Sequence, residues 1–389
     1  MDPSIGPLVP ADETFHHQIT DTFATVAHAD RSWTEKVCAM ACARDGSTQL
    51  AFGIGKYANR NVMDAYAGVS RGVEQWTVRA SRELAADPGT TSVGPIHYVV
   101  EAPLRAIRFR LDANDVQPIA FEWRFEGVVP PFLERREIHR SRDGARLDAD
   151  IVRYHHTGVA SGWFELDGER TEFDDASWVS TRDHSWGVRY QVGAPIADVA
   201  PAPVPEGVAM LIIWCPVLLE RPDGSRYALH LYYQRHTLPA FGYERLEVQG
   251  GFEHPDGRKD HVAAVVPDLR FRDDNRRLLG GTVHCTMTDG SSRPLRVEAV
   301  GDTGFHLGTG LYHGFDGQWH GQWRGRLHLD GEHIGDCSDP ATAHRIHQHR
   351  DAIVRVDDPV GGGAGWGNMQ NVVLGAHPEL GLTADASFL

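Results

Sequence analysis

The chain has 389 residues, 41% of them hydrophobic and 23% charged, which is the composition of a folded globular protein and excludes general disorder. Its 53 acidic residues outnumber the 38 basic ones and give a formal net charge of −15, which argues against binding to nucleic-acid phosphates. At roughly 100 to 200 residues per domain, the length predicts two domains.

Targeting signals and disulfide patterns are not apparent in the sequence. The N-terminus lacks a basic start followed by an apolar stretch, so we expect no signal peptide. The longest apolar run, residues 208–219, contains Pro216 and is shorter than the roughly 20 residues of a membrane-spanning helix. Five cysteines without a Cys-x-x-Cys pair favour reduced thiols. We therefore expect a cytoplasmic protein without a membrane span.

Short strands dominate the expected elements. Residues 226–233 alternate large apolar and more polar side chains, as in a half-buried strand. Similar patterns predict strands, in chain order, at residues 33–44, 48–56, 77–84, 106–112, 119–125, 148–156, 161–166, 208–219, 226–233, 246–252, 282–288, 295–300 and 324–330. Asp-Gly, a preferred pair for hairpin turns, occurs eight times, so we expect an antiparallel meander.

Helical signals are concentrated near the C-terminal end. Ser338-Asp339-Pro340 places a capping residue before a proline and predicts a helix over residues 340–350. A proline-rich segment at residues 194–207 predicts a semi-rigid linker near the middle of the chain. The sequence therefore predicts an all-β protein with two antiparallel β-barrel domains side by side, at residues 1–195 and 196–389, each able to enclose one small ligand.

The densest cluster of chemically active residues is the segment 181–190, just before the linker. In an extended segment, period two places Arg182, His184 and Trp186 on one face, and Asp183, Ser185 and Arg189 on the other. In the functional interpretation, His184 is a general acid or base, oriented by Arg182 or Asp183, beside an apolar wall formed by Trp186. In the structural interpretation, Arg182 and Asp183 satisfy buried backbone groups at the junction of the domains. Both interpretations remain open.

The run Arg182-Asp183-His184-Ser185-Trp186-Gly187 resembles a motif of bacterial proteins similar to carotenoid 1,2-hydratase (hydroxyneurosporene synthase) and to AttH-type proteins. Further similar stretches are residues 59–64, 79–82, 131–135 and 162–168. The resemblance is strongest over residues 33–190. It implies two lipocalin-like barrels and a reaction without a cofactor, such as adding water to, removing it from, or rearranging a hydrophobic unsaturated molecule.

Such a reaction needs a proton donor in an apolar pocket, where burial raises the pKa of a carboxyl group and aromatic faces stabilise a cation. The candidate catalytic residues are Asp183, His184, Asp64 and Glu35. The candidate substrate-binding residues are Arg182, Trp186, Arg60, Asn61, Trp76, Trp214 and Tyr232. Asp64 beside Arg60 and Asn61 could instead anchor a loop, and each tryptophan could simply fill a core.

Three functions remain open at this point. The first is a lyase or isomerase that acts without an organic cofactor on a small hydrophobic molecule, such as a terpenoid, a steroid or a lignin-like aromatic. The second is a non-catalytic carrier of an apolar ligand. The third is a metalloenzyme using His344 and His347, although no metal-binding spacing is present, so we expect no metal. A homodimer is left open.

Overall fold

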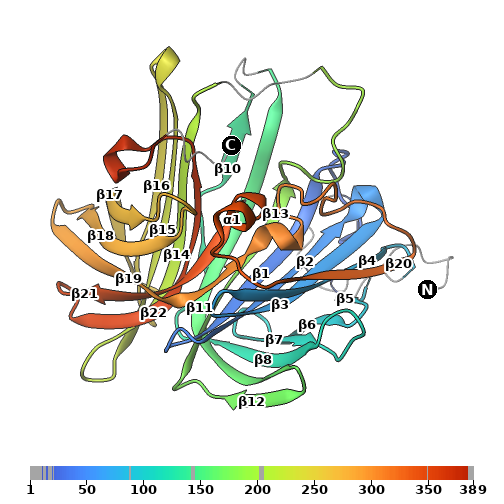
Figure 1. The fold of residues 1–389 in the computed structure, drawn as a ribbon, viewed down its shortest axis with the longest axis horizontal. Coiled ribbons are helices and arrows are strands. Elements are labelled where there is room, and N and C mark those ends of the chain that lie inside the picture. Colours follow the sequence, from blue (N-terminus) through green and yellow to red (C-terminus); the bar gives the residue numbers. More distant parts are fainter. Residues whose placement is uncertain are drawn as a thin grey trace.

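The computed structural model describes residues 11, 15, 20, 22–86, 89–141, 145–200, 206–347 and 349–383. Two antiparallel sheets account for the strands, and the described residues contain one short α-helix (Figure 1). The prediction of an all-β protein is therefore confirmed. The five cysteines are free, in agreement with the expected reduced thiols, and all five are buried.

The larger sheet, which we call the N-terminal half-barrel, has 14 strands. Its main path runs β20-β4-β3-β2-β1-β13-β11-β8-β7-β6-β5, and β9, β10 and β12 pair with β11 beside it. The strands are β1 (Trp33–Ala43), β2 (Thr48–Tyr57), β3 (Val62–Arg71), β4 (Glu74–Glu83), β5 (Ser92–Val93), β6 (Ile96–Ala102), β7 (Ala106–Leu111), β8 (Ile119–Gly127), β9 (Phe132–Leu133), β10 (Glu137–Arg140), β11 (Leu147–Leu166), β12 (Glu169–Phe173), β13 (Trp178–Val188) and β20 (Leu327–Ile334).

The second sheet, which we call the C-terminal barrel, closes on itself in the order β14-β15-β16-β17-β18-β19-β21-β22. Its strands are β14 (Ala209–Glu220), β15 (Arg226–Leu238), β16 (Tyr243–Glu253), β17 (Lys259–Phe271), β18 (Leu278–Met287), β19 (Ser292–His306), β21 (Arg350–Asp358) and β22 (Gly363–Leu374).

The two sheets differ in how they close. Both had been expected to close as barrels, but the path of the half-barrel has two ends, β20 and β5. A side chain of β4, the neighbour of β20, reaches toward β5, because the Arg82 guanidinium donates hydrogen bonds to the backbone oxygens of Ser92 and Thr90, both at 2.8 Å. Apolar cores fill both interiors, with Phe109 and Trp123 in the half-barrel and Leu229 and Phe252 in the barrel.

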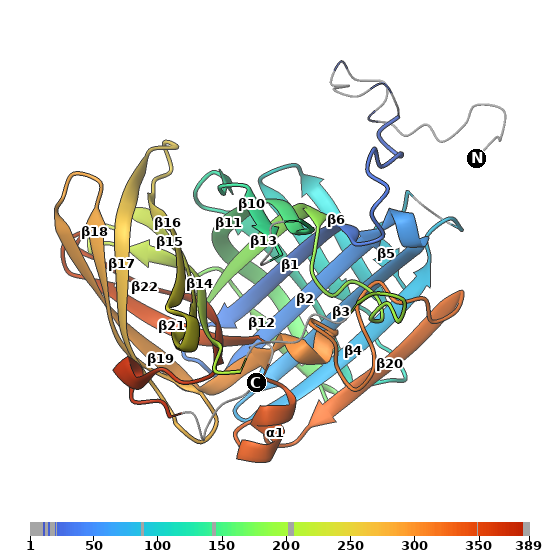
Figure 2. The ribbon, with the colours of Figure 1, turned by 90° about the horizontal axis from the view of Figure 1, so that it is seen from above.

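β20 lies beyond the proline-rich segment in sequence but belongs to the half-barrel. It pairs antiparallel with β4 from Leu327↔Arg82 to Ile334↔Gln75, at the outer edge of the sheet (Figure 2). Residues 201–205 of the expected linker lie outside the described residues. The C-terminal part of the chain therefore completes the N-terminal sheet.

The central strands of the half-barrel are buried on both faces, so β2 and β3 are almost continuously buried. One face covers the interior of the half-barrel, and the other packs against the C-terminal barrel. The core between the sheets contains Cys38, Met40, Cys42, Ala51, Tyr66, Val159, Val179, Leu218, Phe305, Leu307 and Ile353. This two-sided burial joins the two sheets and brings the segment 181–190 between them.

Most of the expected hairpins are present. Asp-Gly pairs at Asp45, Asp167, Asp223, Asp256 and Asp289 join consecutive strands, and Asp143 lies outside the described residues. The pair at Asp330 is an exception because it lies within β20. The two strands expected over 148–166 form one strand, β11.

β22 was not predicted as a strand, because its glycines are more typical of a loop. A side chain at Gly365 or Gly367 would collide with the backbone of β14, since a Cβ atom would lie 1.8 Å from the Leu218 oxygen or 2.1 Å from the Pro216 oxygen. The glycines therefore permit close pairing of two strands in the barrel.

The predicted helix is present but shorter than expected, as α1 (Pro340–Arg345). Ile346 already has a non-helical φ of −109°, and β21 begins at Arg350. Asp339 caps the helix, because its Oδ2 accepts hydrogen bonds from the Thr342 backbone N (2.9 Å) and Oγ1 (3.0 Å).

We expect Asp339→Ala to lower the free energy of unfolding by about 1 kcal/mol, because the substitution leaves the Thr342 amide without its capping partner. Urea denaturation monitored by circular dichroism measures this change. Asp339→Ser keeps a capping oxygen and serves as the control, which should lose no more than a few tenths of that amount. Equal losses in the two variants would contradict the capping role.

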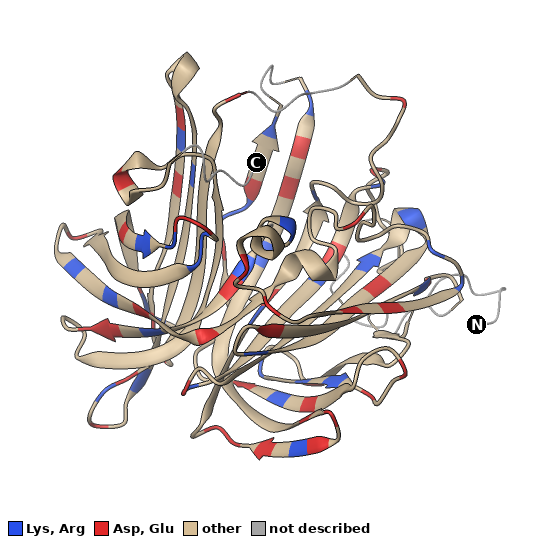
Figure 3. Cartoon of the chain, viewed as in Figure 1, with Lys and Arg blue, Asp and Glu red and all other residues tan. Residues whose placement is uncertain are grey.

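Acidic and basic residues are interleaved along the strands of both sheets (Figure 3). On the outer face of the half-barrel, Arg108 bonds to Glu101 and to Glu122, the latter at 2.7 Å, and Arg124 bonds to Glu101 at 2.8 Å. None of the helices in the described part of the chain is long and apolar enough to span a membrane.

Candidate functional site

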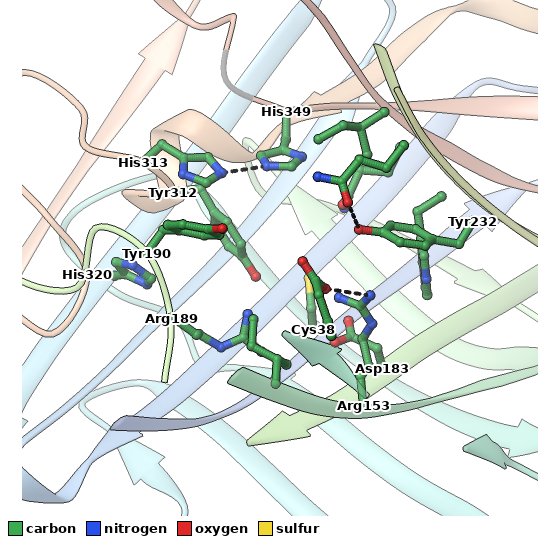
Figure 4. A pocket seen from close by; sticks show the side chains of 16 residues that line it. Cys38, Arg153, Asp183, Arg189, Tyr190, Tyr232, Tyr312, His313, His320 and His349 are labelled. Carbon is green, nitrogen blue, oxygen red and sulfur yellow. Dashed lines mark hydrogen bonds and ion pairs between the residues drawn. The ribbon is translucent and has the colours of Figure 1, made fainter. Parts of the chain in front are cut away.

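A cavity of about 170 Å³ lies between the half-barrel and the C-terminal barrel (Figure 4). Its walls come from β1, β11 and β13 on one side and from β14, β15 and β22 on the other, with the segment 312–320 and His349 at the rim. The lining residues are Cys38, Glu137, Ile151, Arg153, Asp183, Arg189, Tyr190, Ile212, Trp214, Tyr232, Gln234, Tyr312, His313, His320, His349 and Gln370. This volume is below the roughly 300 to 1,000 Å³ of pockets for drug-sized ligands, so the cavity as it stands has room only for a smaller molecule.

β13 presents alternate residues to opposite faces, as predicted for the segment 181–190. The Ser185 hydroxyl lies 3.4 Å from the Asp183 Oδ2 atom and bonds to the Arg189 guanidinium, so these three residues share one face. This face contributes Asp183 and Arg189 to the cavity. The cavity is thus lined by the face of β13 that carries Asp183, and not by the face that carries His184.

The carboxyl group of Asp183 is partly buried in the cavity. Burial raises its pKa, whereas the positive charges of Arg153 and Arg189 favour the ionised form and oppose this rise. The net effect is an upward shift, which lets a carboxylic acid keep its proton closer to neutral pH. Asp183 is therefore suited to donate a proton inside the cavity.

Histidines form the opposite rim, and a buried lysine, Lys36, lies behind them. Nε2 of His313 lies 2.7 Å from Nε2 of His349, and partial burial and the neighbouring His313 hold the pKa of His349 well below its ordinary value. Nζ of Lys36 lies 3.2 Å from Nδ1 of His320 and 3.8 Å from the centre of the Tyr312 ring. Burial lowers the pKa of Lys36 to about 8. The imidazoles are thus neutral hydrogen-bonding groups near pH 7.

Aromatic rings form the wall on the side of the C-terminal barrel, and Arg153 of β11 faces them. The Tyr232 hydroxyl donates to Oε1 of Gln234 at 2.8 Å, and the Arg153 guanidinium lies 5.3 Å from the Tyr232 ring. Trp214 donates its indole N–H to Oε1 of Glu134 at 3.2 Å. Both predicted binding residues from this half, Trp214 and Tyr232, therefore line the cavity.

A buried ion-pair network supports this wall. Glu134 accepts a hydrogen bond from Nε of Arg153 at 2.7 Å, and its Oε1 lies 3.0 Å from Nδ1 of His155. Burial would raise the pKa of Glu134, but Arg153 and His155 hold it well below its ordinary value. Nε2 of His155 lies 2.7 Å from Oε1 of Glu253. His155 therefore joins two carboxylates across the domain junction.

In the described part of the chain, one set of three side chains brings potential metal-ligand atoms within 4.8 Å of one another. It consists of Glu134, His155 and His230. The rings of the two histidines stack with centroids 3.5 Å apart and planes 14° apart. Metal ligation requires the ion to lie near the plane of each ring, and two stacked rings cannot both meet this condition for one ion. The arrangement therefore fits an ion-pair network better than a metal centre. His344 and His347 are not in this set, and Nδ1 of His347 lies 2.6 Å from the His344 backbone oxygen.

Four predicted site residues lie on the other face of the sheet, outside the lining of the cavity. Nε2 of His184 lies 2.9 Å from Oε1 of Glu35, and its Nδ1 lies 3.1 Å from the Tyr154 hydroxyl. Trp186 packs near His184 with ring centroids 6.0 Å apart. Arg182, only 1% exposed, stacks over Tyr154 at 5.3 Å. The structure therefore groups His184, Glu35, Trp186 and Arg182 together but does not bring them to Asp183.

Asp64 and Arg60, which were also predicted site residues, hold loops in place. Asp64 is buried and accepts a hydrogen bond from the Gly321 backbone N at 2.5 Å, which fixes the segment that carries His320. Burial raises its pKa. Arg60 donates to the backbone oxygens of Arg31 (2.7 Å) and Val192 (2.5 Å).

Asn61 and Trp76 also lie away from the cavity. Asn61 adopts a left-handed conformation with φ of 55°, and its Oδ1 accepts a hydrogen bond from the Ala85 backbone N at 2.7 Å. Trp76 stacks on His333 with ring centroids 4.6 Å apart, where β4 meets β20.

Several cavity residues were not among the predicted site residues. Arg153 lies opposite Ser185 in the pairing of β11 with β13, so a correct strand register could have identified it. Tyr312, His313, His320 and His349 follow β19 in irregular segments, and no periodic pattern marks them.

Residues 8–383 match the sequence model of a protein family that is described as a family of unknown function (DUF8625). Among solved structures, a candidate AttH from Nitrosomonas europaea is similar over 89% of this chain and 94% of its own, with 12% identity and a TM-score of 0.51. Kievitone hydratase from Nectria haematococca matches over 87% and 88%, with 10% identity and a TM-score of 0.42. CghA matches over 89% and 90%, with 12% identity and a TM-score of 0.41. No curated protein matches the sequence. The resemblance to AttH-type proteins is thus confirmed for the fold.

Proposed function

The chain belongs to this family of unknown function, and we propose that it is an acid–base enzyme that needs no organic cofactor. Its substrate is a small molecule with an unsaturated or aromatic part and at least one oxygen substituent. The reaction is a hydration, a dehydration or an isomerisation. The observation that carries this proposal is the position of Asp183, a carboxyl group with a raised pKa inside the cavity between the sheets.

Asp183 is the proposed general acid. In its protonated form it donates a proton either to a carbon–carbon double bond or to a departing hydroxyl group, and a positive charge develops on the substrate carbon. The faces of Trp214 and Tyr232 stabilise this charge. The carboxylate that remains on Asp183 is stabilised by Arg153 and Arg189. It takes a proton back from the water that adds to the cation in a hydration, or from the carbon next to the cation in a dehydration or isomerisation, so that the acid is regenerated.

The polar rim defines the substrate class. Neutral His313 and His349 can donate or accept hydrogen bonds, and Gln234 and Tyr190 add further polar groups. Nδ1 of His349 is buried without a hydrogen-bond partner in the described part of the chain, and a pure hydrocarbon would leave it so, which costs free energy. An oxygenated terpenoid, steroid fragment or phenolic compound can supply that partner.

Incubation in heavy water tests this proposal. We expect the purified protein, with no added cofactor, to convert at least one member of a panel of unsaturated and hydroxylated compounds. The product should carry deuterium on carbon for hydration or isomerisation, or should have lost water for dehydration. Liquid chromatography with mass spectrometry measures both changes.

Native mass spectrometry of the protein from its source tests the alternative function, a carrier of an apolar ligand. If an unmodified apolar ligand is retained and no member of the panel is converted, the protein is a carrier and not an enzyme. The convergence of Asp183, Arg153 and Arg189 on one cavity supports the enzyme, because a carrier of apolar ligands has no need for buried ionisable groups.

A further inference from the structure

A second, smaller cavity of about 20 Å³ lies at one end of the C-terminal barrel, beside α1. Its lining residues are Asn275, Arg276, His306, Ala343, His347, Arg350, Asn371 and Val373. It is distinct from the Asp183 cavity, because His349 faces that cavity whereas its neighbour Arg350 faces this one.

Arg350 is a buried cation that makes no ion pair with any of the described residues. It is 7% exposed, and its Nε and Nη1 atoms have no hydrogen-bond partner in the described part of the chain. None of the residues that line the cavity is acidic, and the nearby Arg277 is itself ion-paired with Asp302. Burial lowers the pKa of Arg350 to about 10, so the guanidinium remains charged at neutral pH. A buried, unpaired charge of this kind calls for an anion.

His306 supplies a hydrogen-bond acceptor beside the positive charge of Arg350. It is 3% exposed, and its Nδ1 lies 3.1 Å from the backbone oxygen of Ile346. A carbonyl oxygen can only accept a hydrogen bond, so Nδ1 carries the proton and Nε2 has a free lone pair. Nε2 has no partner in the described residues. Burial and the charge of Arg350 lower the pKa of His306 to about 3, so the ring is neutral.

We propose that this cavity binds a small oxyanion with one negative charge and one hydroxyl group. The charged oxygens accept hydrogen bonds from Arg350, and the hydroxyl donates to Nε2 of His306. Hydrogen carbonate and dihydrogen phosphate share this chemistry. The small volume, near the roughly 10 to 15 Å³ that one water needs, favours hydrogen carbonate. A halide ion lacks the hydroxyl group and leaves His306 without a donor.

Thermal unfolding of the full chain tests the site. At neutral pH and constant ionic strength, sodium hydrogen carbonate should raise the Tm in a saturable manner by roughly 2 °C or more, and sodium chloride should not. Arg350→Met should lose this response. Without the anion, this variant should unfold at the same temperature as the wild type or higher, because it no longer buries an unpaired charge.

Two further variants make the test specific. His306→Phe keeps a ring but no acceptor, and it should lose the response while Arg350 remains. Arg355→Met, on the same strand, removes an arginine that is already paired with Asp357 at 2.8 Å, and it should keep the response. A response to phosphate that depends on Arg350 supports the shared oxyanion chemistry and identifies phosphate as a ligand. The absence of any such shift, an equal shift with chloride, or a full response in Arg350→Met would overturn the proposal.

Discussion

Asp183→Asn is expected to reduce turnover of the true substrate by about a hundredfold or more, the usual contribution of a positioned general acid. Asparagine has nearly the same shape as a protonated aspartic acid but cannot donate an acidic proton. The change also removes a charge that burial disfavours, so the folded protein should lose no thermal stability. Turnover at saturating substrate measures the first effect, and the Tm measures the second.

The pH dependence should identify the acid. Because the proposed reaction needs protonated Asp183, wild-type turnover should fall as the pH rises through the raised pKa of this group. Asp183→Asn should lose this pH dependence together with the activity. Glu35→Gln is the matched control, because Glu35 lies on the opposite face and bonds to His184. If Asp183→Asn keeps full turnover, or if Glu35→Gln is equally impaired, the proposed role of Asp183 is wrong.

Asp351→Asn should raise the free energy of unfolding above pH 7 by up to about 4 kcal/mol, the equivalent of a pKa shift of roughly three units. Asp351 is fully buried on β21, and Nδ2 of Asn368 donates to its two oxygens at 2.7 and 2.9 Å. Burial raises its pKa from 3.8 to about 7, and the nearby charge of Asp183 contributes to this rise. An asparagine keeps an acceptor for Asn368 and removes the charge.

The sign of this effect depends on pH. Between about pH 4 and pH 7, the folded protein binds a proton on Asp351 that the unfolded chain has already released, so wild-type stability falls as the pH rises. The advantage of Asp351→Asn should therefore be absent near pH 4, grow through this range and stay constant above it. Urea denaturation at several pH values measures the difference. Asp357→Asn, on the same strand but more exposed, should show no such gain. A gain that does not vary with pH would refute the buried-acid explanation.

Local sequence patterns predicted much of the fold. Alternating residues and Asp-Gly pairs identified several hairpins in each sheet, because these signals depend on neighbouring residues only. The pairing of β20 with β4 could not be predicted in this way, since it joins segments far apart in the chain. The close approach of β22 to Pro216 is likewise a tertiary contact, which its glycines permit but do not specify.

The candidate site was predicted in part for the same reason. The segment 181–190 was expected at the domain junction, and its alternation placed Asp183 and His184 on opposite faces. Alternation alone cannot say which face meets the second barrel when β13 is buried on both sides. Asp183 therefore lines the cavity, whereas His184 lies within hydrogen-bonding distance of Glu35 on the other face. Tyr312 and His349 come from irregular segments whose positions depend on the finished fold.

The pairing of β20 with β4 has a consequence for synthesis on the ribosome. The edge of β4 stays open until residue 334 has left the exit tunnel, when most of the chain has been made. An open strand edge can pair with other nascent chains and cause aggregation. The first half of this polypeptide therefore depends on late translation for protection, and truncation before β20 should leave an insoluble fragment.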